Sequence, residues 1–220
     1  MLKYPCLVLD PDDTVVQSES TVNYPYFCYI LDQFRPGQTI SLEEYIYGCC
    51  HLGFIEMCRT KYNFTDDELH QEYLGWKDYM KSHIPTPYPG IESIIRRHKA
   101  EGGILCVVSH SGEENIKRDY MEHFCILPDD IYGWDYPEHQ RKPAPYPLLA
   151  IMEKYNLKPE QLIVIDDMKP AYEMASSVGV DIGFAKWSKE NQPDICRNME
   201  KICNFTFASP GELEHFLFDV

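Results

Sequence analysis

This sequence has few basic residues, and no stretch of it is apolar enough to cross a bilayer. It contains 20 Lys and Arg against 35 Asp and Glu, which gives a formal net charge of −15. Such an acidic surface disfavours nucleic acid and anionic membranes as partners. The lack of an apolar run of about 20 residues argues against a transmembrane helix. A small anionic substrate is not excluded, because a metal ion or a lysine can reverse the potential locally.

The sequence also lacks paired-cysteine motifs and an export signal. None of the nine cysteines belongs to a CxxC pair, so we expect free, mostly buried thiols. The first residues, MLKYPC, show neither the long apolar stretch nor the cleavage pattern of a signal peptide. Together with the lack of a membrane span, the lack of a signal peptide predicts a cytoplasmic protein.

Four short apolar runs have the composition of buried parallel strands, namely 6–9, 104–108, 162–165 and 181–185. Each is almost continuously apolar, as expected for strands covered on both faces. Helical patterns at 91–100, 145–157 and 170–178 precede the last three of them. This alternation predicts an α/β fold with a doubly wound, mostly parallel sheet, that is, a Rossmann-like core. A final strand and helix are expected within 203–207 and 209–217.

Residues 17–86 do not alternate in this way and are expected to be all helical. Helix starts are predicted at two capping boxes, Ser41 with Glu44 and Thr65 with Glu68. Another helix is expected within 21–34. The segment 66–82 carries four apolar residues at helical spacing, which predicts a stripe that faces the core: Leu69, Tyr73, Trp76 and Met80. Tyr45, Tyr47 and Phe54 are also expected to pack in this core.

Three prolines and a glycine in 84–90 indicate a stiff connection at a domain boundary. We therefore predict a catalytic core formed by residues 1–16 and 87–220, and a helical cap formed by residues 17–86.

Polar side chains follow three of the predicted strands. Since the carboxyl ends of parallel strands meet at one edge of a sheet, these side chains should converge. They are Asp10, Asp12 and Asp13 after the first strand, Ser109, His110 and Ser111 after the second, and Asp166 and Asp167 after the third, with Lys142 ahead of the third strand. Each group has an ordinary structural explanation, such as a turn for Asp13 or a helix cap for the serines. The ordered set at one edge favours a functional site.

The chemistry of this set suits phosphoryl transfer. Carboxylates at two strand ends are the oxygen ligands that Mg²⁺ prefers. One carboxylate can attack phosphorus, and a second can act as acid and then as base. A hydroxyl can hold the transferring oxygens, and a lysine can offset their charge.

In this order the motifs resemble those of the haloacid dehalogenase superfamily, in the phosphoglycolate phosphatase and β-phosphoglucomutase-like group with a helical cap after the first strand. The first motif, DxDGT, is similar to residues 10–14, and the others to Ser109, Lys142-Pro143 and Asp166-Asp167. The resemblance spans the whole chain. It implies a phosphatase that uses Mg²⁺ and an aspartyl-phosphate.

The resemblance also assigns roles to single residues. It implies that Asp10 is the nucleophile and a metal ligand, and that Asp12 is the acid/base and ligates the metal through its carbonyl. It implies that Ser109 and Lys142 bind and stabilise the phosphoryl group, and that Asp167 ligates Mg²⁺ with Asp166 beside it. His110, where asparagine is frequent, is a candidate contact to phosphate or leaving group, with helix capping as the alternative.

The sequence departs from the family pattern in three further places. Pro11 follows the nucleophile and removes one backbone N–H that would point at the phosphate. The loss of one such donor costs roughly 10²–10³ in rate if nothing replaces it. Asp13 replaces the usual glycine, and Ala171 fills a position that is often acidic.

Two other functions stay open. A phosphotransferase or mutase would use the same motifs, and Pro11 leaves room for a catalytically weak phosphate-binding remnant. A receiver-type signalling module is rejected, because its acidic pair follows the first strand rather than a late one. We expect a small phosphorylated metabolite as the partner, and a monomer or weak dimer.

Overall fold

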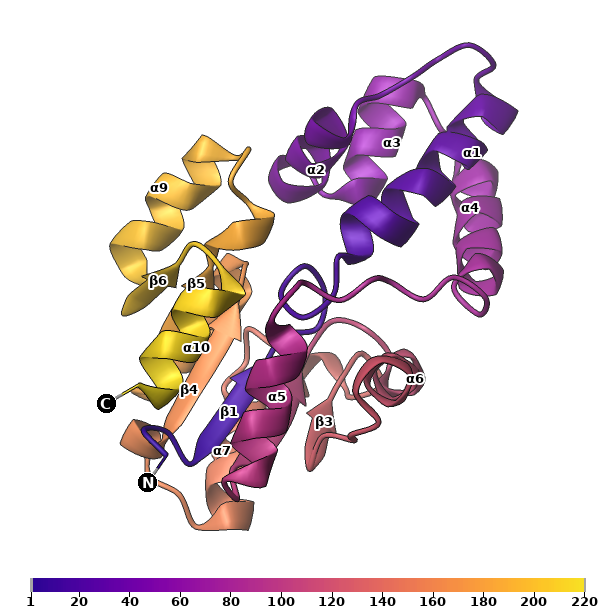
Figure 1. Cartoon of the computed structure of the whole chain (residues 1–220). Coiled ribbons are helices and arrows are strands. Elements are labelled where there is room, and N and C mark those ends of the chain that lie inside the picture. Colours follow the sequence, from indigo (N-terminus) through magenta and orange to yellow (C-terminus); the bar gives the residue numbers. More distant parts are fainter. Residues whose placement is uncertain (1, 220) are drawn as a thin grey trace. The chain divides into compact units, whose positions relative to one another are not determined.

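The computed structural model describes residues 2–219. The chain forms two compact units. One unit comprises Met1–Val16 and Pro87–Val220, and the other comprises Gln17–Thr86. We call them the core unit and the helical unit and describe each by itself (Figure 1).

The core unit is built on a parallel sheet. Six strands occur in the described residues, in the order β3-β2-β1-β4-β5-β6, and every neighbouring pair is parallel. Their bounds are β1 Cys6–Leu9, β2 Ile104–Val108, β3 Asp130–Tyr132, β4 Leu162–Asp166, β5 Asp181–Ala185 and β6 Phe205–Phe207. The predicted fold class, a doubly wound parallel sheet with an inserted helical segment, is confirmed.

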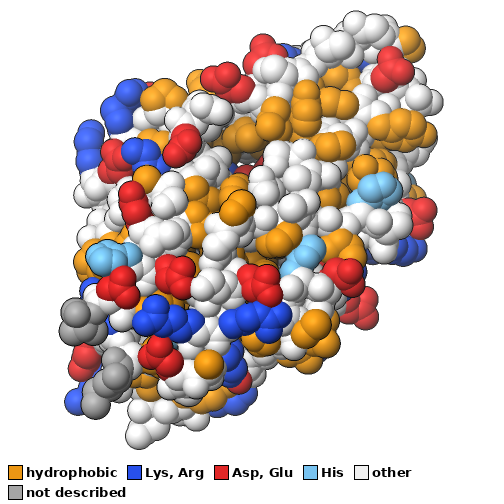
Figure 2. Space-filling view, in the orientation of Figure 1, with side chains coloured by type: hydrophobic (Ala, Val, Ile, Leu, Met, Phe, Trp, Pro, Cys, Tyr) orange, Lys and Arg blue, Asp and Glu red, His pale blue; other side chains and the backbone are white. Residues whose placement is uncertain are grey.

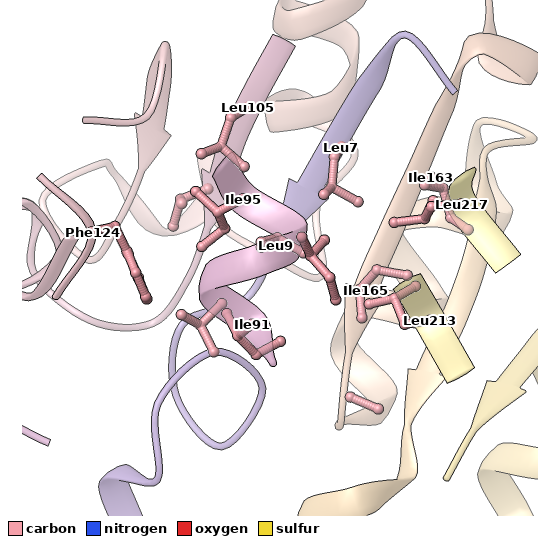
Figure 3. Close-up of a cluster of buried hydrophobic side chains, with 14 of the residues drawn as sticks. Leu7, Leu9, Ile91, Ile95, Leu105, Phe124, Ile163, Ile165, Leu213 and Leu217 are labelled. Carbon is pink, nitrogen blue, oxygen red and sulfur yellow. The ribbon is translucent and has the colours of Figure 1, made fainter. Parts of the chain in front are cut away.

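Helices cover both faces of this sheet. Alternate strand residues such as Leu7 and Leu9 pack on one face with α5 (Ile91–Ala100), α6 (Glu113–Phe124) and α10 (Pro210–Phe218). Figure 3 shows this cluster. Cys6 and Val8 point the other way and pack with α7 (Tyr146–Tyr155) and α8 (Lys169–Ser177). Since side chains alternate along a strand, burial on both faces explains why each strand is apolar throughout.

Some elements of the core unit were not predicted. They are β3, α9 (Pro193–Ile202) and three short 3₁₀ turns, η2 (Glu138–Gln140), η3 (Pro159–Gln161) and η4 (Lys186–Ser188). The strand β3 has only three residues, Asp-Ile-Tyr, and its partner is β2. So short a segment carries no periodic signal, and its pairing depends on the tertiary structure.

Charged side chains of both signs are interspersed on the face of the core unit around α5 (Figure 2). Two ion pairs there follow helical spacing, Arg96 with Glu92 and Arg97 with Glu101. They are exposed and contribute little stability each. The negative charge of the chain is therefore not gathered into one patch on this face.

The helical unit contains a π-helical turn η1 (Glu19–Asn23) and four helices, α1 (Tyr24–Phe34), α2 (Leu42–His51), α3 (Phe54–Tyr62) and α4 (Asp66–Tyr79). Both predicted capping boxes are present, at the starts of α2 and α4. The core of this unit is rich in aromatic residues, with Phe27, Tyr45, Tyr62 and Phe64 among its buried members.

One expectation for α4 is wrong. Met80 is buried, and Leu69 and Trp76 are partly buried, but Tyr73 is 50% exposed. The buried residue within α4 is instead Glu72, which is 7% exposed. Helical spacing alone does not show which side of a stripe is covered, because the neighbouring helices decide this. Tyr47 is exposed for the same reason.

All nine cysteines are free thiols, as predicted, but only four of them are buried. Within residues 2–219, no helix combines the length and the apolar composition needed to pass through a membrane.

Candidate active site

The polar residues after β1 form a tight turn at the carboxyl end of the sheet. The Asp10 N–H donates to the Ile165 carbonyl at 3.0 Å, and the Pro11 carbonyl accepts from Val15 and Val16 at 2.9 Å each. Asp13 has a φ of 53°, in the left-handed region that aspartate tolerates better than most residues. The turn therefore keeps Asp10 directly at the end of the strand.

The topology of the sheet explains why the three polar groups meet. β1 lies between β2 and β4, with Leu9 in register with Val107 and Ile165. The strand order reverses here, and such a switch point is where open α/β sheets bind ligands. Asp10, Ser109 and Asp166 consequently reach one edge from adjacent strands, as the sequence predicts.

Lys142 joins two of these strand ends. Its Nζ lies 2.6 Å from Asp10 Oδ1 and 2.7 Å from Asp166 Oδ2, and all three residues are buried. Burial alone lowers the pKa of Lys142, but the two carboxylates raise it above its usual value. The lysine therefore stays cationic between the two carboxylates.

Asp12 is held by hydroxyl groups from the loop after β2. Its Oδ2 accepts from Ser111 Oγ at 2.5 Å and from Ser109 Oγ at 3.4 Å. The Ser111 N–H donates in turn to Ser109 Oγ at 2.9 Å. Ser111 belongs to the polar set that the sequence predicts at this edge, but no role in the site was predicted for it.

His110 contacts the backbone next to the lysine. Its Nε2 lies 2.8 Å from the Lys142 carbonyl oxygen, so this nitrogen carries the proton and donates. The ring also meets Trp134 edge-on, at 6.1 Å between centroids. In this structure His110 thus contacts the segment that carries Lys142.

A second buried lysine at this edge was missed by the sequence reasoning. Lys189 is 3% exposed, and its Nζ lies 2.7 Å from Asp167 Oδ2 and 2.9 Å from Asp13 Oδ2. It comes just after η4, beyond the end of β5. No site residue was predicted at the end of this strand. Its partner Asp13 was predicted only to shape a turn, so the structure gives this aspartate an additional role.

The donor set at the site fits a small divalent cation. Carboxylate oxygens of Asp10, Asp166 and Asp167 lie within 4.8 Å of one another, and all three residues are buried. Asp12 and Asp13 bring the carboxylates to five, and two lysines, Lys142 and Lys189, pair with members of this group. Hard oxygen donors with an excess of negative charge suit Mg²⁺.

The same excess of negative charge affects the nucleophile candidate. Burial raises the pKa of Asp10 well above its ordinary value, Lys142 opposes this, and the neighbouring carboxylates add to it. A cation among these groups would favour the ionised form of Asp10.

Fold and site together define an α/β enzyme with a carboxylate–lysine centre at the switch point of its sheet. The model of one family, the haloacid dehalogenase-like hydrolases, matches residues 7–185. This chain therefore belongs to that family of enzymes, as the resemblance of its motifs implied.

Comparison with individual proteins gives more distant likenesses. A phosphoglycolate phosphatase of Aquifex aeolicus (strain VF5) is 26% identical over 157 residues, which cover 67% of this chain and 68% of the relative. Among solved structures, a predicted phosphoglycolate phosphatase from Haemophilus somnus 129PT is 18% identical over 98% of this chain and 99% of that one, with a TM-score of 0.74. A mutant of CbbY from Rhodobacter sphaeroides, in complex with xylulose-1,5-bisphosphate, is 17% identical over 97% and 96%, with a TM-score of 0.66.

Proposed function

We propose that this protein is a Mg²⁺-dependent phosphatase that hydrolyses a small phosphorylated metabolite through an aspartyl-phosphate on Asp10. The observation that carries the proposal is the contact of Lys142 with both Asp10 and Asp166 at the switch point. An ammonium group beside a carboxylate nucleophile offsets the charge that develops as a phosphoryl group approaches.

Asp12 is the proposed acid and base. The hydroxyl groups of Ser109 and Ser111 fix its carboxyl two residues from the nucleophile. In the first step Asp12 donates a proton to the leaving-group oxygen, and in the second it accepts a proton from the attacking water. The Ser109 hydroxyl and Lys142 bind the phosphoryl oxygens, while His110 steadies the Lys142 segment and offers its other ring nitrogen to the substrate.

The residues proposed to hold the cation are Asp10, Asp166 and Asp167, with the Asp12 carbonyl as a further ligand. When bound, Mg²⁺ supplies positive charge opposite the phosphoryl oxygens. The fit rests on the three grouped carboxylates and on their excess of negative charge.

The named relatives support the reaction class rather than a particular metabolite. The Aquifex relative is named a phosphoglycolate phosphatase, and the Rhodobacter protein was crystallised with a sugar bisphosphate. We therefore propose a small phosphate monoester as substrate. We further propose that residues 17–86 act as its cap, that the chain acts as a monomer or weak dimer, and that its free thiols reflect a cytoplasmic location.

The test is the release of inorganic phosphate from p-nitrophenyl phosphate, with and without Mg²⁺. We expect metal-dependent turnover in the wild type and a loss of at least about 10³-fold in Asp10→Asn. Asp194→Asn, which changes an exposed carboxylate on α9, serves as the matched control and should keep full activity. Turnover that survives Asp10→Asn or ignores the metal would contradict the proposal.

A further inference from the structure

The helical unit contains a pocket that the phosphatase mechanism does not use. It has a volume of about 340 Å³, which is within the usual range of roughly 300–1,000 Å³ for small-ligand pockets. Its lining consists of Glu19, Asn23, Tyr45, Cys49, Phe54, Glu72, Tyr73 and Trp76. All eight residues belong to the helical unit, so the pocket is defined within that unit alone.

Three helical segments build this pocket from pairs at i, i+4 spacing, which places two side chains on one helix face. The pairs are Glu19 with Asn23 on η1, Tyr45 with Cys49 on α2, and Glu72 with Trp76 on α4. The start of α3 contributes Phe54. The lining therefore comes from every helix of the unit except α1.

Hydrogen bonds fix one wall of the pocket. Trp76 Nε1 donates to Asn23 Oδ1 at 2.9 Å, and Asn23 Nδ2 donates to Glu19 Oε1 at 3.2 Å. Tyr73 stacks beside Trp76 with an interplanar angle of 23°. The indole ring is thus oriented before any ligand arrives, which lowers the entropic cost of binding.

Glu72 is the feature that requires an explanation. The residue is 7% exposed and lines the pocket, yet its carboxylate has no hydrogen bond or ion pair with any of residues 2–219. The Tyr26 hydroxyl donates to the backbone carbonyl of Glu72, at 3.1 Å, and not to its carboxylate. A buried carboxylate without a partner is costly unless a positive charge reaches it.

The pocket itself supplies no positive charge. Among its eight lining residues there is no Lys, Arg or His, and the other ionisable side chain at neutral pH is a second acid, Glu19. The remaining walls are largely aromatic. The face of an aromatic ring is partly negative and attracts cations. Pockets walled by several aromatic rings bind quaternary ammonium groups.

We propose that this pocket binds an organic ammonium group, with Glu72 as its counter-ion and Trp76, Tyr73, Tyr45 and Phe54 as its aromatic walls. An organic cation fits better than a metal ion, because aromatic walls cannot replace the water ligands of a metal. Within the described residues, the carboxylates grouped closely enough for a metal are those of the core unit. This proposal does not rest on the phosphatase activity.

The pH dependence of binding follows from Glu72. Burial raises the pKa of Glu72 from 4.5 to about 7, so its charge appears between about pH 6 and 8. The other titratable groups that face it are Glu19 on η1, Tyr26 on α1, Tyr45 and Cys49 on α2, and Cys58 on α3. Burial raises the pKa of Tyr26 and of Cys58 to about 12, and raises those of Tyr45 and Cys49 as well. Those four groups stay neutral in this range.

The test is a calorimetric titration of the full chain with choline and with tetramethylammonium at about pH 8. We expect saturable binding of both probes, and binding about 10-fold weaker at about pH 6, where Glu72 is mostly protonated. The uncharged isostere of choline, 3,3-dimethylbutan-1-ol, should bind at least about 10-fold more weakly than choline.

Two variants assign the site. Glu72→Gln keeps the shape of the side chain and should weaken choline binding by roughly 10- to 100-fold. Asp67→Asn, an exposed acid on the same helix, is the matched control and should leave it unchanged. A thermal unfolding curve confirms that Glu72→Gln is folded. Trp76→Leu should weaken binding by roughly 5- to 30-fold.

Three results would overturn the proposal: no saturable binding of either probe at about 50 mM, equal binding of the neutral isostere, or unchanged binding in Glu72→Gln. The source of the ammonium group is decided separately with choline phosphate. If Glu72→Gln raises the KM for choline phosphate but not for p-nitrophenyl phosphate, the ammonium group belongs to the substrate. If the KM for choline phosphate is unchanged, the ligand of the pocket is a free amine. If no phosphate ester is hydrolysed at all, the phosphatase proposal fails, but the binding result still stands.

Discussion

Two regions of this molecule bury carboxylates, and they treat the charge differently. At the sheet edge of the core unit, Asp10, Asp166 and Asp167 are each within 2.7 Å of a lysine nitrogen. In the pocket of the helical unit, Glu72 has aromatic neighbours and no cation among the described residues. In the first region two lysines of the chain offset part of the negative charge and leave an excess of carboxylates. The second can be neutralised only by a proton or by a ligand.

The largest expected effect comes from breaking the pairing at the core site. Lys142→Met leaves Asp10 and Asp166 buried beside each other without their shared cation. We expect a loss of about 3–5 kcal/mol in the free energy of unfolding and of at least about 10³-fold in phosphatase turnover. Urea denaturation and phosphate release measure the two. Near-wild-type stability would show that Lys142 does not form the buried contacts with Asp10 and Asp166 that the structure contains.

Lys189→Met tests the lysine that the sequence reasoning missed. It leaves Asp13 and Asp167 without the ammonium group that contacts both, so we expect a loss of about 3–5 kcal/mol in unfolding free energy. Lys186→Met is the matched control, because Lys186 forms a partly exposed pair with Glu200. It should change stability by less than about 1 kcal/mol. Equal effects of the two variants would remove Lys189 from the site.

Glu72→Gln should change stability in the opposite direction. In the unfolded chain Glu72 ionises near 4.5, whereas the folded protein holds the proton up to about pH 7. The folded form therefore binds more protons between these values, and wild-type stability falls as the pH rises through this window. Glu72→Gln has no such titration. It should exceed the wild type by on the order of 3 kcal/mol at about pH 8 and match it at about pH 4.5.

Denaturant unfolding at both pH values, with Asp67→Asn as the control, measures this difference. Saturating choline at about pH 8 should narrow this difference in unfolding free energy, since the ligand binds the wild type more tightly and stabilises it more than the variant. If the difference in unfolding free energy between Glu72→Gln and the wild type does not change with pH, Glu72 is not a buried carboxylate without a cationic partner. This outcome would remove the contrast between the two regions.

The smallest expected effect concerns Pro11. The backbone carbonyl of Pro11 accepts two hydrogen bonds, from Val15 and Val16. The carbonyl of an alanine can accept the same two bonds, so Pro11→Ala should keep the turn. The new N–H adds one donor next to the nucleophile, and we expect turnover to rise by up to about 10-fold. Phosphate release under saturating Mg²⁺ measures it. Lower turnover would mean that the rigidity of Pro11 matters more than the missing donor.

Much of the fold and part of the site could be predicted from the sequence. Strands at 6–9, 104–108 and 181–185 and the helix at 91–100 have the predicted bounds, because a segment buried on both faces or along one stripe shows its pattern locally. The aspartates after β1 and β4 and the serine after β2 could be located because parallel strands deliver their ends to one edge. Their proposed roles await the experiments above.

By itself, the sequence determined the strands, the capped helices and the chemical character of the sheet edge, since these depend on local patterns. Only the tertiary structure decided that Lys189 reaches Asp13 and Asp167, because 176 residues separate it from Asp13 and no local pattern links them. It also decided that α4 buries Glu72 and exposes Tyr73. The sequence places both residues on one helix, and the packing of the neighbouring helices determines which of the two side chains is buried.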